Sequence, residues 1–182
     1  MNNSALDSPS SSLKVQCCIV GGGPAGMMLG YLLARAGIKT VVLEKHADFF
    51  RDFRGDTVHP STLKVMQELG LLEDFLKVPH DEVSKLNALF GNTSIRLADL
   101  SRLDTVCPFI AFMPQWDFLN FLDEKGKRFP HLSVLKNTEA VELLQDGERI
   151  VGVSAKTQSG LMNITADLTV ACDGRHSVMR EQ

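Results

Sequence analysis

The chain has 182 residues, of which 44% are hydrophobic and 23% are charged, and its formal net charge is −3. This length and composition suit one domain, or one and a half, with a buried core, and the weak negative charge offers no basic surface for nucleic acid. No apolar run approaches the roughly 18 residues of a transmembrane helix, so we expect no integral membrane segment.

The cysteine content favours a reducing compartment. The four cysteines (Cys17, Cys18, Cys107 and Cys172) form no C-x-x-C pair, and three of them lie in apolar runs. We therefore expect reduced thiols and a cytoplasmic protein. Residues 1–14 are polar and serine-rich, which predicts a disordered tail and not a signal peptide. The five histidines show no metal-ligand spacing, so no metal site is expected.

The first ordered elements form a strand, a helix and a second strand. Val15 to Val20 is an almost continuous apolar run, typical of a strand that is buried on both faces. An amphipathic helix is predicted from Pro24 to about Ala36, with Gly37 as its C-terminal cap. Ile38 to Glu44 is rich in β-branched residues and predicts the next strand. This order indicates a right-handed βαβ unit.

The turn between the first strand and the helix has the G-x-G-x-x-G spacing of a dinucleotide-binding turn. Gly21 would permit the sharp turn, Gly23 would let a pyrophosphate approach the backbone, and Gly26 would let helix and strand pack closely. Pro24 suits the first turn of the helix, whose free N–H groups and partial positive charge attract an anion. Such a motif alone is weak evidence, because glycine turns also end ordinary strands.

Glu44 ends the second strand, eighteen residues after Gly26. A carboxylate at this place can accept hydrogen bonds from both ribose hydroxyls. It would also repel a 2′-phosphate, which favours FAD or NAD over NADP as the bound dinucleotide.

The middle of the chain interrupts the α/β pattern. Before the interruption, the sequence predicts a helix from Pro60 to Leu69 and a short helical piece from Leu71 to Leu76. Strands are then predicted at Val83–Phe90 and Thr93–Ala98, on either side of the turn dipeptide Gly91-Asn92. The apolar run Cys107–Met113 and a helix from Gln115 to about Phe129 follow.

The last third predicts a β-meander. Its expected strands are Leu132–Lys136, Glu139–Leu144, Ile150–Lys156, Leu161–Ala166 and a final buried strand, Leu168–Cys172. Asp173-Gly174 follows that strand, and Ser177–Gln182 predicts the start of a helix. The fold class is therefore α/β, a Rossmann-like parallel sheet with a β-meander crossover, at residues 15–82 and 114–182. Residues 83–113 are expected to be part of an inserted, β-rich substrate layer.

Four motifs together resemble one family, the FAD-dependent aromatic hydroxylases that include para-hydroxybenzoate hydroxylase. They are VGGGPAGMMLGYLLARAG with VVLEKH, then RGDTVHPSTL, PQWDFLNFL and ADLTVACDGRHSVMR, in the family's order. The last contains a complete D-G-x-x-S-x-x-R signature, formed by Asp173, Gly174, Ser177 and Arg180. The resemblance covers nearly the whole chain.

The resemblance implies a set of FAD-binding residues. The pyrophosphate would lie at the turn, Glu44 would bind the adenosine ribose with Lys45 nearby, and Arg54 would reach the cofactor from the loop after the second strand. Gln115 would border the ribityl chain, the Val141 backbone would meet the adenine, and Asp173 would contact the ribityl or pyrophosphate region. The implied contacts are Gly21, Gly23, Pro24, Ala25, Gly26, Glu44, Lys45, Arg54, Gln115, Val141 and Asp173. No catalytic residue is nominated.

Simpler interpretations of the same residues stay open. By composition alone Arg54 is a solvated loop residue, Gln115 a helix cap and Asp173-Gly174 a turn. His59 before Pro60 is better explained as a helix-start residue than as a catalytic group.

The function implied by the resemblance is an FAD-dependent monooxygenase. It would use NADH or NADPH as transient reductant and dioxygen to hydroxylate an aromatic or polycyclic small molecule. The family's downstream Gly-Asp motif does not occur in this sequence, so we expect the N-terminal portion of a larger, truncated enzyme that is inactive by itself. The alternatives are a non-catalytic dinucleotide-binding module, or a reductase or halogenase of the wider FAD superfamily.

Overall fold

The structure is a computed structural model that describes residues 11–50 and 56–182. Its contacts divide the chain into two compact units. The first comprises Met1–Phe50 and Leu122–Gln182, and the second comprises Arg51–Phe121.

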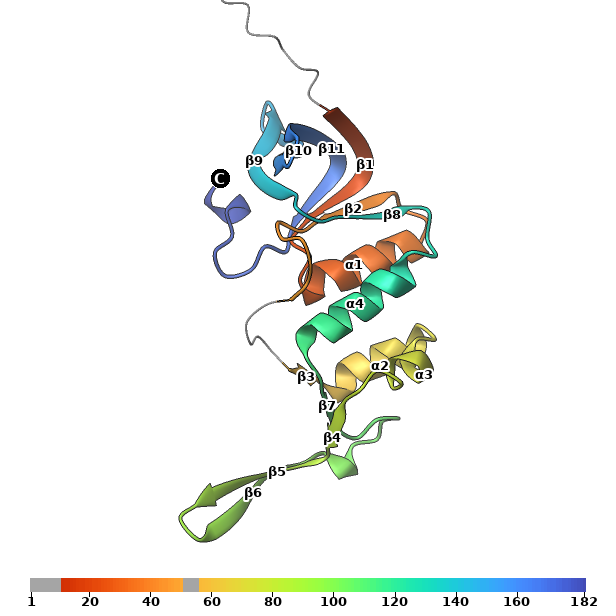
Figure 1. The fold of residues 1–182 in the computed structure, drawn as a ribbon, viewed down its shortest axis with the longest axis vertical. Coiled ribbons are helices and arrows are strands. Elements are labelled where there is room, and N and C mark those ends of the chain that lie inside the picture. Colours follow the sequence, from red (N-terminus) through yellow and green to blue (C-terminus); the bar gives the residue numbers. More distant parts are fainter. Residues whose placement is uncertain (1–10, 51–55) are drawn as a thin grey trace, which may run out of the picture. The chain divides into compact units, whose positions relative to one another are not determined.

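The first unit is built on a six-stranded sheet with the order β8-β2-β1-β11-β10-β9 (Figure 1). Neighbours among the first four strands in that order run parallel, whereas β11, β10 and β9 form an antiparallel meander. The strands are β1 (Ser11–Val20), β2 (Thr40–Leu43), β8 (Leu132–Leu135), β9 (Glu139–Asp146), β10 (Arg149–Thr157) and β11 (Gly160–Ala171). This arrangement confirms the predicted Rossmann-like α/β class with its β-meander.

Helix α1 (Pro24–Arg35) packs closely on the parallel part of the sheet. Gly30 makes the close approach possible, because an added Cβ would lie 2.6 Å from Cγ2 of Val42. The apolar run at the end of β1 is buried as predicted, with Cys18 and Ile19 fully inaccessible. Gly37 follows the helix with φ +80°, in agreement with its predicted role at the helix end.

Two strands differ from the prediction because they pair with each other. β1 begins at Ser11, so residues 11–14 of the expected disordered tail form strand, in parallel register with Met162–Thr165 of β11. β11 joins the two runs that were predicted as separate strands. Asp167, which separates those runs in sequence, is exposed and lies within the continuous strand, so its charge stays in solvent.

The end of the chain also differs from its prediction. Ser177–Gln182 was expected to start an α-helix, but the structure has a single 3₁₀ turn, η2 (Met179–Glu181).

The described residues of the second unit form two small antiparallel sheets, two complete helices, a 3₁₀ turn and the first part of a further helix. Its elements are β3 (Thr57–Val58), α2 (Pro60–Glu68), α3 (Leu72–Phe75), β4 (Asp81–Val83), β5 (Lys85–Phe90), β6 (Thr93–Asp99), the 3₁₀ turn η1 (Leu100–Arg102) and β7 (Ile110–Phe112). α4 (Gln115–Gly126) begins in this unit, and the division falls after Phe121. β5 and β6 form the predicted hairpin, with Gly91 at φ +60° in its turn.

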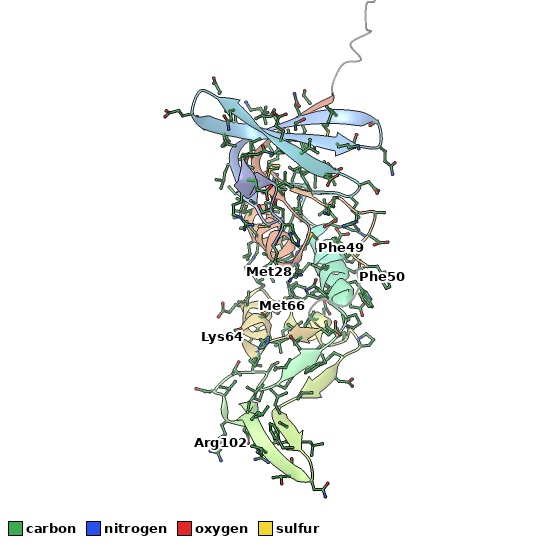
Figure 2. The ribbon with its side chains drawn as sticks, turned by 90° about the vertical axis from the view of Figure 1, so that its left-hand side faces the viewer. Met28, Phe49, Phe50, Lys64, Met66 and Arg102 are labelled. Carbon is green, nitrogen blue, oxygen red and sulfur yellow. The ribbon has the colours of Figure 1, made fainter. Side chains whose placement is uncertain are left out.

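Packing in the second unit follows the amphipathic pattern of its sequence. On α2, Met66 is buried and Lys64 is exposed (Figure 2). Phe75 of α3 meets Phe118 and Phe121 of α4 edge to face, with ring centroids 5.9 and 5.1 Å apart. The predicted apolar run Cys107–Met113 forms strand only at Ile110–Phe112, because Pro108 has no N–H to offer a ladder.

Among the described residues, none of the helices has the length and apolar character that crossing a membrane requires.

Candidate dinucleotide site

The glycine turn lies where β1, β2 and β11 end. The Gly21 N–H donates to the Leu43 carbonyl at 2.9 Å, and the Cys172 N–H donates to the Val20 carbonyl at 2.7 Å. Gly21 has φ +109°, and a Cβ there would lie 2.3 Å from the carbonyl oxygen of Cys172. Both its backbone conformation and its neighbour therefore require glycine, as predicted for the sharp turn.

Gly26 and Gly23 differ in the space around them. A Cβ on Gly26 would lie 1.9 Å from the Gly21 carbonyl oxygen and 3.2 Å from Cγ2 of Ile19, so helix and turn pack too closely for any side chain. Gly23 has an ordinary φ of −75°, and a Cβ there would meet no described atom within 4 Å. The open space in front of Gly23 is what a ligand approaching the backbone would need.

The N-terminus of α1 opens onto the same turn. Gly23 is its N-cap and provides no side chain to satisfy the first N–H groups, while Pro24 and Ala25 occupy the first turn and are exposed. An uncapped helix N-terminus with a partial positive charge suits an anionic group.

Glu44 lies beside the glycine turn and is held firmly. Its N–H donates to the Leu135 carbonyl and its carbonyl accepts from the Thr138 N–H, each at 2.9 Å. Its carboxylate Oε1 accepts from the His46 N–H at 2.9 Å, and the residue is only 9% exposed. The strand end thus presents a fixed carboxylate next to the turn, as the spacing predicted.

Gly22 is a residue of this site that the sequence reasoning missed. A Cβ on Gly22 would lie 2.8 Å from the Glu44 Cβ and 2.9 Å from its Oε2. The carboxylate therefore fills the space that a side chain at position 22 would take. The available signal was the run of three glycines, which exceeds what the G-x-G-x-x-G pattern needs.

The segment after Glu44 is anchored by Lys136, which the sequence did not single out. The Lys136 Nζ lies 4.3 Å from the ring centroid of Phe49 and 2.9 Å from Oδ2 of Asp123. Phe49 is 3% exposed, whereas its neighbour Phe50 is 64% exposed (Figure 2). Lys45 is exposed at the start of this segment, and its contact with adenosine stays a prediction.

The D-G-x-x-S-x-x-R signature bonds mainly to itself. Asp173 Oδ2 accepts from the Met179 N–H at 3.3 Å, and Ser177 Oγ accepts from the Arg180 N–H at 3.1 Å. The Arg180 guanidinium donates to the Arg175 carbonyl at 2.9 Å. These bonds give the signature a structural role, and a direct contact of Asp173 with the cofactor stays a prediction.

The structure does not place the remaining predicted contacts beside the glycine turn. Val141 lies on β9, the last strand of the sheet, and its carbonyl accepts from the Gln182 Nε2 at 3.1 Å. Gln115 begins α4 in the second unit. Arg54 lies outside the described residues. The structure therefore brings together the turn, Glu44 and the start of the signature at one end of the sheet, and the roles of these residues toward a ligand remain predictions.

The thiols near the turn are neutral at physiological pH. Burial, with a smaller effect from the Cys17 thiol, raises the pKa of Cys18 to about 12. Burial is also the main cause that raises the pKa of Cys17 and of Cys172. These side chains therefore act as small apolar packing groups at the strand ends.

Comparison with known proteins gives relatives across nearly the whole chain. An uncharacterised aromatic compound monooxygenase, YhjG of Bacillus subtilis strain 168, is 32% identical over 174 residues, which are 93% of this chain and 33% of that protein. The 6-methylpretetramide 4-monooxygenase of Streptomyces rimosus is 27% identical over 173 residues, covering 95% of this chain and 41% of that protein. The chain thus spans about a third to two fifths of these relatives' lengths.

A solved structure shows the same fold. The p-nitrophenol 4-monooxygenase PnpA of Pseudomonas putida DLL-E4 superposes with a TM-score of 0.80 at 25% identity, covering 93% of this chain and 43% of PnpA. The sequence model described as FAD binding domain matches residues 14–182, from the first strand through the D-G-x-x-S-x-x-R signature. Because this match extends over most of the chain and includes the turn and Glu44, the chain belongs to the FAD binding domain family.

Proposed function

We propose that this chain is the FAD-binding portion of an NAD(P)H-dependent flavoprotein monooxygenase that hydroxylates an aromatic or polycyclic small molecule. The observation that carries the proposal is the pairing of two features at the turn. Gly23 is a glycine that no described part of the chain requires, and the buried Glu44 carboxylate lies against the neighbouring Gly22.

These features fit the adenosine diphosphate half of FAD. The open face of Gly23 and the uncapped start of α1 would receive the pyrophosphate. The Glu44 carboxylate would accept from the ribose hydroxyls, and it would reject a 2′-phosphate by charge repulsion. Since the Glu44 backbone bonds to Leu135 and Thr138 and its carboxylate accepts from the His46 N–H, the residue would bind the ribose without a large rearrangement.

The proposed reaction follows from the relatives' names. YhjG and PnpA are named as monooxygenases of an aromatic compound and of p-nitrophenol, and the Streptomyces protein as a monooxygenase of 6-methylpretetramide. When bound and reduced by NADH or NADPH, FAD supplies the chemistry that activates dioxygen for transfer to an electron-rich ring. The residues of this chain would bind and orient the cofactor's adenosine half.

A cytoplasmic location is part of the proposal, and it is supported by four cysteines that are all free.

The experiment is a titration of the chain with FAD, followed by flavin fluorescence, for the wild type, Glu44→Gln and Glu44→Ala. Losing charge-assisted hydrogen bonds to the ribose should weaken FAD binding by about tenfold or more. Glu44→Gln should also reduce the discrimination against 2′-phospho-ADP relative to ADP, because the repelling charge is gone.

Glu148→Ala is the matched control, since this carboxylate is exposed in the turn between β9 and β10. It should bind FAD like the wild type. Unchanged affinity in both Glu44 variants would show that the ribose lies elsewhere, and a wild-type chain with no FAD binding would refute the proposed function.

A further inference from the structure

The segment after β11 runs from the glycine turn to the edge of the sheet. It begins at Cys172, whose N–H bonds to Val20 beside the turn. It ends in the 3₁₀ turn η2, which packs against the edge strand β9 (Figure 1). This short segment thus connects two places that are far apart in the sheet order but that both belong to the proposed FAD site.

Met179 inserts this segment into the core. Its side chain is 6% exposed and belongs to the buried cluster of the first unit. Three other members of that cluster are the last residues before predicted FAD contacts. They are Val20, Leu43 and Ala140, which precede Gly21, Glu44 and Val141. The core beneath the proposed site is therefore completed by a residue of η2.

Gln182 ties the same segment to β9 by hydrogen bonds. Its Nε2 donates to the Val141 carbonyl at 3.1 Å, and its Oε1 accepts from the Leu143 N–H at 2.8 Å. β9 is the last strand in the sheet order, so these two groups lie on its outer edge. The carboxamide therefore takes the place of a neighbouring strand along residues 141–143 of β9.

The bonds within the signature hold η2 in this position. Asp173 accepts from the Met179 N–H at the start of η2, and Ser177, which is 4% exposed, accepts from the Arg180 N–H. Gly174 has φ +84°, which permits the chain to reverse directly after Asp173. The direction of the segment is thus fixed at its start, in its middle and at its end.

We propose that η2 is a brace for the adenosine end of the FAD site, with Met179 and Gln182 as positioning residues that do not touch the cofactor. Met179 supports the ends of β1, β2 and the start of β9 through the shared core, and Gln182 fixes the edge of β9. A ligand site needs such a supporting layer, because loosely held contact residues lose the geometry that binding requires. This inference rests on the proposed function of FAD binding.

A matched pair of methionine variants tests the packing part. Met162 packs against the same cluster, but it pairs with Ser11, at the opposite end of β1 from Gly21. Met179→Ala should weaken binding of FAD and of ADP by about tenfold, whereas Met162→Ala should change it by less than about twofold. Met179→Leu, which conserves volume, should restore the wild-type affinity. FAD is followed by flavin fluorescence and ADP by NMR shifts, at a temperature where unfolding curves show each variant folded.

The hydrogen-bonding part is tested by Gln182→Ala, which removes no buried group and keeps the experiment decisive if Met179→Ala fails to fold. It should weaken FAD and ADP binding by about threefold without changing the unfolding temperature. Gln158→Ala, in the exposed turn between β10 and β11, is the control and should bind like the wild type.

The outcomes separate this inference from the proposed function. If the wild type binds FAD and both pairs of variants show no difference, the brace is refuted and the FAD site stands. If Met179→Leu binds as weakly as Met179→Ala, positioning by packing is refuted. A wild-type chain that binds neither FAD nor ADP would refute the proposed function and the brace with it.

Discussion

At the scale of single residues, the positions of the turn hold glycine for different physical reasons. Gly21 and Gly26 are required by the fold, because a Cβ at either position would overlap a backbone oxygen. Gly22 is required by the Glu44 side chain. Only Gly23 has neither an unusual backbone angle nor a crowded neighbourhood among the described residues. Its N-cap position favours glycine only modestly, and the open space in front of it is what the proposed pyrophosphate contact would need.

This difference predicts that a glycine-to-alanine substitution has different effects at positions 23 and 26. Gly23→Ala should alter the free energy of unfolding by less than about 1 kcal/mol, since the N-cap preference for glycine opposes the lower entropy of the unfolded chain. It should nevertheless weaken FAD binding, because the methyl group occupies the approach to the backbone. Gly26→Ala should destabilise the protein by about 3 kcal/mol or more, since the Cβ would lie 1.9 Å from the Gly21 oxygen.

Urea unfolding and FAD titration on both variants measure the two effects separately. Equal loss of stability in Gly23→Ala and Gly26→Ala would contradict the distinction. Full FAD affinity in a folded Gly23→Ala would remove the main argument for the pyrophosphate position.

At the scale of secondary structure, β10 contains a register shift that its sequence pattern does not predict. The register between β9 and β10 shifts between Ile150 and Gly152, and Gly152 has φ +152°. A Cβ on Gly152 would lie 2.0 Å from the Ile164 carbonyl oxygen of β11. The glycine therefore lets two strands of the meander approach each other at a bulge.

We expect Gly152→Ala to destabilise the protein by about 3 kcal/mol, through backbone strain and overlap with β11. Gly147 provides a matched comparison, since it also has positive φ, +61°, but has open space around it. Gly147→Ala should cost about 1 kcal/mol, the strain term alone. Chemical denaturation of both variants gives the comparison, and similar losses would mean that overlap with Ile164 is relieved by a small shift.

The elements that could be predicted from the sequence are those whose signals are local. The βαβ unit, the turn glycines and the position of Glu44 follow from hydrophobic period and spacing within one short segment, and the structure has them where they were expected. The Gly91-Asn92 hairpin followed from turn chemistry in the same way. Strand limits were wrong at Ser11 and Asp167, because pairing between β1 and β11 overrode the local polar residues.

Features that depend on contacts between distant segments could not be predicted. The contact of Gly22 with Glu44, the position of Lys136 over Phe49 and the burial of Met179 all join separate parts of the sequence. A single sequence carries no period or spacing that specifies such pairs. The resemblance indicated the signature around Asp173, but not that its hydrogen bonds hold a turn against β9.

At the scale of the whole molecule, the described contacts concern one end of the cofactor. The turn, Glu44 and Val141 belong to the first unit, and all three are predicted to meet the adenosine diphosphate half of FAD. The relatives are longer, because this chain covers 33% of YhjG and 41% of the Streptomyces monooxygenase. In these two relatives, more than half of the protein lies outside the matched region.

The 182-residue polypeptide should therefore bind FAD weakly and should not hydroxylate by itself. Since most of the predicted contacts meet the adenosine diphosphate half, FAD should bind no more than about tenfold more tightly than ADP, a difference of about 1.4 kcal/mol. Titrations with both ligands measure this ratio, and NADPH oxidation with p-nitrophenol or a polycyclic phenol present measures turnover. A protein that purifies with tightly bound yellow flavin and oxidises NADPH in a substrate-dependent way would show that these residues suffice for the whole reaction. A large preference for FAD over ADP without turnover would instead place strong flavin contacts in this chain, with Gln115 and Arg54 as the first residues to substitute.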